Sequence, residues 1–186
     1  YIDNLLSVRK NINDNLDSKN KKISINDFFI KASAVALAEN PDCNIIWAEE
    51  HLVKFKNSNI GVAISSKSGL YTPTLNNVQS KSLSDISNEM KLLIGKADEK
   101  SLRGTDFGDC SHAISNLGMY GVDNFDAIIN PPNSSILAIG AVQSKLEIVN
   151  EKTQDSKIIS VTLSVDHRAI DGATAANFLN KIVFYI

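Results

Sequence analysis

The chain has 186 residues, of which 43% are hydrophobic, 22% charged and 6% aromatic, and its formal net charge is −2. This composition is typical of one globular domain with an adequate core, and it excludes collagen-like, disordered, disulfide-scaffold and membrane-bundle proteins. The balanced charge and the single Trp argue against a nucleic-acid-binding surface, and no apolar stretch approaches the ~20 residues that span a bilayer.

The two cysteines, Cys43 and Cys110, lie far apart and lack the spacing of a metal site, which favours free thiols in a reducing compartment. The chain opens at Tyr1, already inside a helical pattern and without a Met. We therefore expect it to be a fragment of a longer protein.

The first half of the chain alternates between helical and extended patterns. The pattern predicts helices over 2–16, 28–39 and 82–100, strands over 52–56 and 60–65, and a short extended piece at 69–73. Asn26 is the predicted N-cap of the second helix. Ser82 and Asp85 have the spacing of a capping box at the start of the third.

The last third is mostly extended. It predicts strands over 113–117, 127–129, 135–142, 145–149 and 158–165, turns at 131–133 and 150–156, and a closing helix over 172–184. Strands mixed with a few helices, and hairpin-length gaps between the late strands, predict one α/β (α+β) domain with a mixed sheet covered by helices.

His167 is the one histidine placed where a general base is useful. It follows an apolar strand and precedes a helix that begins with small residues, so its backbone is held on both sides at the rim of the sheet. An imidazole with an unperturbed pKa of ~6.5 accepts a proton near neutral pH. Asp171 lies four residues further on. Taken alone, the pair also fits a structural turn in which Asp171 caps the helix that starts at Gly172.

The other two histidines are not expected to form a functional site. His51 follows two glutamates in a polar loop and is expected at the surface. His112 lies near Cys110, but a metal ion needs more ligands than this neighbourhood offers. The sequence therefore predicts no metal site.

The string Asp166-His167-Arg168, followed by Asp171-Gly172, resembles the active-site signature of the 2-oxo acid dehydrogenase acyltransferases, the E2 components. Other segments agree with that family in order and spacing, and together they span essentially the whole chain: 5–10, 25–28, 69–73, 114–119 and 128–132. The stretch 115–121 is most similar to the acetyl-transferring branch of the pyruvate dehydrogenase complex. The presence of His167 separates the chain from the non-catalytic relative known as component X.

The resemblance implies a chloramphenicol acetyltransferase-like two-layer sandwich. It also implies that residues 1–186 form an acyltransferase catalytic domain, truncated at its N-terminal side and without the lipoyl and subunit-binding domains of such chains. The expected activity is transfer of an acetyl group between dihydrolipoamide and coenzyme A. The lipoyl group would arrive on a separate lipoyl domain, and no metal would take part.

Site roles are carried over from the family position by position. His167 would remove the proton from the thiol of coenzyme A, and Ser115 would donate a hydrogen bond to the oxyanion. Asp171 would anchor the His167 turn through an ion pair with an arginine that precedes Tyr1. Three residues would line the coenzyme A channel: Phe125, Asn130 and Leu137.

The resemblance also implies a homotrimer, with His167 from one subunit and Ser115 from the next at each active site. Trimers would assemble into a larger core that works with lipoyl domains and the E1 and E3 components, with no nucleic-acid or membrane partner. Residues 184–186 are expected either at such contacts or packed on the chain's own sheet. The expected location is bacterial cytoplasm or the mitochondrial matrix.

One segment departs from the family. Residues 109–113 read Asp-Cys-Ser-His-Ala, where relatives tend to have a Gly-Gly-Thr-Phe-Thr-like run. Three alternatives stay open: a branched-chain or succinyl acyltransferase, a structural core subunit without turnover, and an antibiotic O-acetyltransferase. The last is disfavoured, because Asp166 stands where that branch usually has a second histidine.

Overall fold

The computed structural model describes residues 1–16, 22–149 and 152–186. The helices are α1 (Asp3–Asp14), α2 (Ile25–Glu39), α3 (Leu83–Asp98) and α4 (Gly172–Phe184). The strands of the first half are β1 (Ile45–Ala48), β2 (His51–Lys54), β3 (Ile60–Val62), β4 (Ile64–Ser66), β5 (Gly69–Tyr71) and β6 (Thr74–Leu75). Those of the second half are β7 (His112–Asn116), β8 (Ser135–Ile139), β9 (Gln143–Val149), β10 (Lys152–Ile158) and β11 (Val161–Val165).

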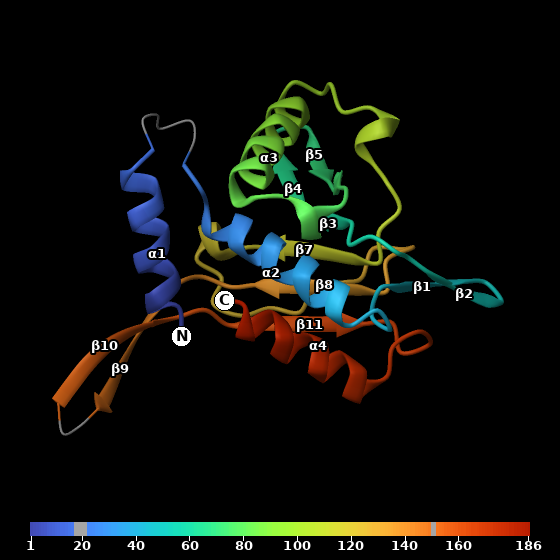
Figure 1. Cartoon of the computed structure of the whole chain (residues 1–186). Coiled ribbons are helices and arrows are strands. Elements are labelled where there is room, and N and C mark those ends of the chain that lie inside the picture. The colour runs from blue at the N-terminus through green and yellow to red at the C-terminus, as the bar shows by residue number, and fades with distance from the viewer. Residues whose placement is uncertain (17–21, 150–151) are drawn as a thin grey trace.

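A mixed five-stranded sheet is the centre of the fold, with strand order β11-β8-β7-β3-β6. The central strand β7 is parallel to both of its neighbours, β8 and β3. The outer strands β11 and β6 are antiparallel to theirs. This confirms the predicted mixed sheet, and it means that β7 and β11 run in opposite directions (Figure 1).

Helices α2 and α4 cover one face of this sheet, and α3 packs against α2 (Figure 1). Most strand residues that point toward the helices are large and apolar, and they form the core with helix residues such as Phe178. In β8, for example, Leu137 and Ile139 are completely buried in that core. Because successive strand residues point to opposite faces, Ala113, Ser115 and Ala138 lie on the other face, which is lined mostly by small side chains.

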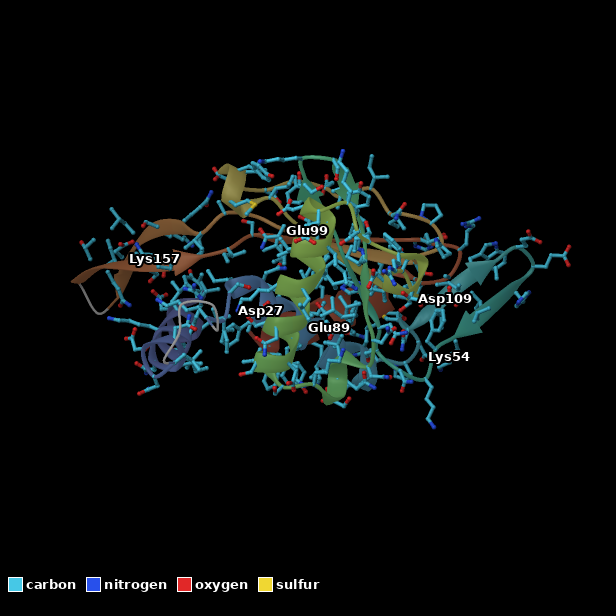
Figure 2. The ribbon with its side chains drawn as sticks, turned by 90° about the horizontal axis from the view of Figure 1, so that it is seen from above. Asp27, Lys54, Glu89, Glu99, Asp109 and Lys157 are labelled. Atoms are coloured by element: carbon cyan, nitrogen blue, oxygen red, sulfur yellow. The ribbon has the colours of Figure 1, made fainter. Side chains whose placement is uncertain are left out.

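Two hairpins project from opposite ends of the molecule, as Figures 1 and 2 show: β1–β2, which carries Lys54, and β9–β10, which carries Lys157. Helix α1 lies against β10. The amide of Ile2 donates to the carbonyl of Lys157 at 2.8 Å, and the Asp3 carboxylate accepts from the amide of Lys157 at 3.1 Å. These bonds tie the N-terminal helix to the hairpin.

All four predicted helices are present, and Ser82 and Asp85 form the predicted capping box of α3. The predicted cap of α2 was wrong by two residues. Ser24, not Asn26, accepts from the amide of Asp27, whose side chain accepts in turn from the amide of Ser24. No helix of the described residues is long and apolar enough to cross a membrane.

Several strand boundaries differ from prediction. The predicted strand at 127–129 is irregular, and most of the predicted turn at 150–156 is strand β10; residues 150 and 151 lie outside the described chain. The polar residues of β10 suggested a loop, but β9 pairs with them along the whole strand. Strand β1 was missed, since only four apolar residues signal it.

Candidate active site

His167 lies on a tight turn between the end of β11 and the start of α4, and its side chain is exposed. The amide of Asp166 donates to the carbonyl of Ser134 at 2.7 Å, which extends the β11–β8 pairing by one bond. The amides of Ala169 and Ile170 both donate to the carbonyl of Asp166, at 3.0 and 2.9 Å. The backbone on both sides of His167 is therefore fixed, as the sequence predicted.

An ion pair flanks the histidine. The Arg168 guanidinium donates from Nε and Nη2 to the Asp166 carboxylate, at 3.0 and 2.7 Å, and this bonding lowers the pKa of Asp166. The same guanidinium lies 5.8 Å from the ring centroid of Trp47 in β1, within the range of a cation–π contact. Trp47 was not predicted from the sequence, since no pattern links β1 to a turn so distant in the chain.

Asp171 is the N-cap of α4. Its carboxylate accepts from the amides of Ala173 and Thr174, both at 2.9 Å, and from the Thr174 hydroxyl at 2.8 Å. These bonds, led by the one from the amide of Thr174, lower the pKa of Asp171, and the nearby His167 contributes a smaller lowering. The capping role considered from sequence is thus present. The expected ion pair with an arginine before Tyr1 stays a prediction.

Ser115 is the fourth residue of β7, half-buried on the small-residue face. Within the described chain its hydroxyl has no hydrogen-bond partner, whereas the next side chain, Asn116, accepts from the amide of Gly118 at 2.9 Å and donates to Asn26. A serine hydroxyl in this position keeps its proton available for an acceptor that arrives from outside.

Ser115 and His167 do not meet within one chain. Ser115 pairs with Ala138 near the end of β8, whereas Val165, two residues before His167, pairs with Ser135 at its beginning. With about 3.3 Å per residue along a strand and about 4.8 Å between strands, the Cα atoms of Ser115 and Val165 are roughly 14 Å apart, and His167 lies two residues beyond Val165. Each protomer therefore carries Ser115 at one end of its sheet and His167 at the other.

The three predicted channel residues have different surroundings. Phe125 is half-buried and Asn130 exposed, both on the irregular segment 122–130. This segment reaches the small-residue face at Asn124, whose side chain accepts from the hydroxyl of Thr162, the residue paired with Ala138. Leu137 is completely buried in the core beneath the helices, which leaves it no surface for a ligand in this chain. Leu137 is therefore left out of the proposed coenzyme A contacts.

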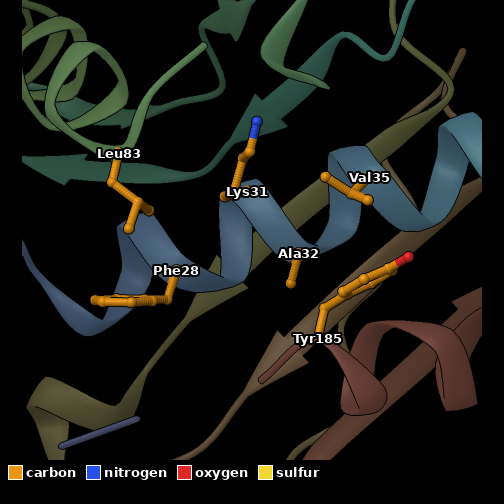
Figure 3. Close-up of a pocket in the computed structure, with 6 residues that line it drawn as sticks. All are labelled: Phe28, Lys31, Ala32, Val35, Leu83 and Tyr185. Carbon is orange, nitrogen blue, oxygen red and sulfur yellow. The ribbon is translucent and has the colours of Figure 1, made fainter. Parts of the chain in front are cut away.

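A pocket of about 280 Å³ lies elsewhere, between α2, the start of α3 and the C-terminus (Figure 3). It is mostly apolar, and its lining residues are Phe28, Lys31, Ala32, Val35, Leu83 and Tyr185. Lys31 donates to the carbonyls of Gln79 and Lys81, so its ammonium is used by the protein itself. None of the predicted catalytic residues lines this pocket.

The described residues contain no group of three or more His, Cys, Asp or Glu side chains arranged to hold a metal ion. Cys43 and Cys110 are free and buried. Burial is the main cause that raises the pKa of Cys43, to about 11, so this thiol is protonated at neutral pH.

Comparison with known proteins agrees with this geometry. The sequence profile of the 2-oxoacid dehydrogenases acyltransferase (catalytic domain) family matches residues 1–186. The dihydrolipoyllysine-residue acetyltransferase component of the pyruvate dehydrogenase complex of Rickettsia bellii is 44% identical over 179 residues, which are 96% of this chain and 43% of that protein. The Rhizobium meliloti protein of the same name is 40% identical over 189 residues, covering 100% of this chain and 42% of that protein.

Solved structures show the same fold. A probable dihydrolipoamide acetyltransferase from Listeria monocytogenes superposes with a TM-score of 0.90 at 30% identity, covering 97% of this chain and 78% of that one. The Azotobacter vinelandii dihydrolipoamide acetyltransferase, studied for the catalytic role of a serine, a histidine and an asparagine, also gives 0.90, at 31% identity over 97% of this chain and 75% of that one. A chloramphenicol acetyltransferase, at 15% identity and a TM-score of 0.53, shares the fold.

The chain spans less than half the length of the curated relatives it matches. The family match nevertheless extends from its first described residue to its last. The chain belongs to the 2-oxoacid dehydrogenase acyltransferase family and corresponds to its catalytic domain.

Proposed function

We propose that this domain transfers an acetyl group between dihydrolipoamide and coenzyme A, in an active site that His167 of one protomer and Ser115 of its neighbour form together. One observation carries the assignment. The serine and the histidine studied in the Azotobacter vinelandii enzyme are 52 residues apart, and the asparagine follows the histidine by four. Ser115, His167 and Asp171 have the same separations.

The chemistry requires two things of the protein. The reaction exchanges one thioester for another, so the barrier lies in the scarcity of thiolate and in the charge of the tetrahedral intermediate. A free thiol with a pKa of ~8.5 is only a few per cent ionised at pH 7. His167 removes the thiol proton, which contributes about 10²–10⁴-fold to the rate. The thiolate then attacks the acyl carbonyl directly, without an acyl-enzyme. The tetrahedral intermediate collapses by breaking the bond to the dihydrolipoamide sulfur, and this leaving thiolate takes the proton from His167.

The second requirement is a donor for the oxyanion. The hydroxyl of Ser115, which has no partner among the described residues, supplies it, and removal of one such donor costs about 3 kcal/mol of transition-state stabilisation. In this mechanism Ser115 acts as a hydrogen-bond donor to the oxyanion and not as a nucleophile. Asp171 supports the site by capping α4 directly behind the His167 turn.

Completion of the site requires assembly. A cyclic trimer places the His167 end of each sheet against the Ser115 end of the next and closes on itself. The exposed side chains of Val183 and Phe184 adjoin the apolar pocket lined by Tyr185 and supply contacts between trimers in a larger core. A related pyruvate dehydrogenase core is cubic. In this proposal lipoyl domains deliver the substrate, and the E1 and E3 components bind the same complex.

The proposed compartment is bacterial cytoplasm or the mitochondrial matrix, because relatives come from bacteria and, in Dictyostelium discoideum, from mitochondria. Phe125 and Asn130 are the proposed contacts for coenzyme A on the small-residue face.

A thioester-exchange assay with dihydrolipoamide and acetyl-CoA tests the proposal. We expect turnover by the wild type, a fall of about 10²–10⁴-fold in His167→Ala, and faster reaction with acetyl-CoA than with succinyl-CoA or branched acyl-CoA. An assembled wild type without turnover would mark the domain as a structural core subunit. Preference for a longer acyl group would assign it to another branch.

A further inference from the structure

The segment that departs from the family, 109–113, contains a histidine that the proposed mechanism does not use. His112 is the first residue of β7 and is completely buried. Its Nδ1 lies 2.8 Å from the hydroxyl of Ser135, and its ring meets that of Phe178 of α4 edge to face, with centroids 5.2 Å apart. Its Nε2 has no hydrogen-bond partner among the described residues.

The surrounding bonds define the tautomer. The hydroxyl of Ser135 donates to the carbonyl of Ser111 at 3.4 Å, so Nδ1–H of His112 is the donor to Ser135 and Nε2 carries a bare lone pair. Burial lowers the pKa of His112 to about 3, so the ring is neutral at working pH. A buried, half-satisfied imidazole costs stability, so its presence calls for an explanation.

The position of Ser135 supplies that reason. Ser135 is the residue of β8 that pairs with Val165, the last residue of β11. The next amide along β11, that of Asp166, donates to the carbonyl of Ser134, and His167 follows at once. His112 therefore bonds to the end of the sheet at which β11 ends and the His167 turn begins.

Further hydrogen bonds stabilise the same end of the sheet. Ser111 donates through its hydroxyl to Asn44 at 2.6 Å, and its carbonyl accepts from the amides of Ser134 and Ser135 at 2.9 and 3.1 Å. Asn133 donates to the carbonyl of Cys110 at 3.1 Å. Residues 110–112 are thus bonded to residues 133–135. Ser134 and Ser135 in turn pair with the end of β11, where the His167 turn begins.

We propose that His112 is a positioning residue. Its bond to Ser135 fixes the end of the sheet from which the His167 turn begins, and this sets where the His167 imidazole lies relative to the thiol of coenzyme A. This inference rests on the proposed function. His112 touches no substrate and transfers no proton.

The test compares His112→Phe, which keeps a ring of similar shape without the donor, with Ser135→Ala and with the double variant, all as assembled protein. We expect kcat for acetyl transfer to fall about three- to tenfold in each, with KM for acetyl-CoA within about twofold, since a small displacement of a catalytic group affects the chemical step most. The double variant should fall no further than Ser135→Ala, because the bond between His112 and Ser135 is already absent in that variant. His112→Asn, whose side-chain amide takes the place of Nδ1–H, should recover part of the rate.

Ser33→Ala is the control for loss of a buried hydroxyl. Ser33 lies in α2, is completely buried, and its hydroxyl has no partner in the described chain. Its kcat should equal that of the wild type. Unchanged kcat in both His112→Phe and Ser135→Ala, with assembly intact, would overturn the inference, as would strictly additive losses.

A readout without substrate separates this inference from the proposed function. The rate at which diethyl pyrocarbonate modifies His167, followed by mass spectrometry of its peptide against pH, reports the exposure and basicity of that imidazole. We expect this profile to shift in His112→Phe and Ser135→Ala but not in Ser33→Ala. A wild type without acetyl transfer would overturn the proposed function, and the His167 profile would still decide the role of His112. An unshifted profile would count against it.

Discussion

Ser115 and His167 lie at opposite ends of one sheet, on strands that run in opposite directions. Ser115 is near the end of β7, whereas His167 follows the end of β11, and β8 between them is parallel to the first and antiparallel to the second. No rotation of either side chain spans this separation, which is already roughly 14 Å at Val165, two residues before His167. If both residues serve one tetrahedral intermediate, they come from different protomers.

Mixed assembly tests this arrangement. His167→Ala and Ser115→Ala are each expected to be nearly inactive as homomers. When the two variants are unfolded together in equal amounts and refolded, a trimer assembled at random has both native groups at about one quarter of its interfaces. The mixture should therefore regain about one quarter of the wild-type rate in the exchange assay.

The control is the same mixture combined after assembly, which should stay inactive. Recovery there would indicate subunit exchange, and a refolded mixture without activity would contradict a shared site.

Substitutions of Asp171 distinguish its role as the N-cap of α4 from the predicted role in an ion pair. Asn is as good an N-cap as Asp, whereas Ala removes the acceptor for the amides of Ala173 and Thr174 at a cost of about 1 kcal/mol. We expect Asp171→Asn to keep both its urea unfolding midpoint and most of its turnover, and Asp171→Ala to lose both in part. A large loss of activity in Asp171→Asn with unchanged stability would instead favour the ion pair with an arginine before Tyr1.

The helices could be predicted from the sequence because each of their signals is local. The capping box of Ser82 and Asp85 lies within four residues, and the apolar period of each helix repeats several times. The wrong N-cap predicted for α2 also follows from reliance on local signals. Ser24 and Asn26 are both good capping residues, and only the chain's entry into the helix decides between them.

The site was predictable only in part. The string around His167 is contiguous and identifies the turn, but the partners of that turn come from elsewhere in the chain. Trp47 of β1 contacts Arg168, and strand register brings His112 to Ser135. The burial of Leu137 was not predictable for a related reason. Leu137 lies on the face of β8 that points into the core. In a run of apolar strand residues, the sequence does not show which residues point to which face of the sheet.

Glycine substitutions test the packing beside Ser115. Gly140 follows β8, and a Cβ there would lie 2.0 Å from the carbonyl oxygen of Asp123, which no side-chain movement relieves. We expect Gly140→Ala to lower the free energy of unfolding by several kcal/mol or to prevent folding. Gly95 lies in α3, and a Cβ added there would meet no atom within 4 Å, so Gly95→Ala should raise stability by about 0.5–1 kcal/mol. Equal effects of the two substitutions in urea unfolding would contradict the close approach of segment 122–124 to β8.

Acid stability tests the burial of His112. Its pKa is lowered from 6.5 to about 3 in the folded state by desolvation, while the unfolded chain binds a proton near the ordinary value. The folded state therefore has its full stability above pH ~6.5 and loses up to about 1.4 kcal/mol per unit as the pH falls toward 3. His112→Phe has no such proton to bind, so its urea midpoint should fall less than that of the wild type between pH 7 and pH 4. His51→Phe is the control: His51 is exposed in β2, and the wild-type slope should remain. Parallel curves for wild type and His112→Phe would show that the imidazole is hydrated in solution.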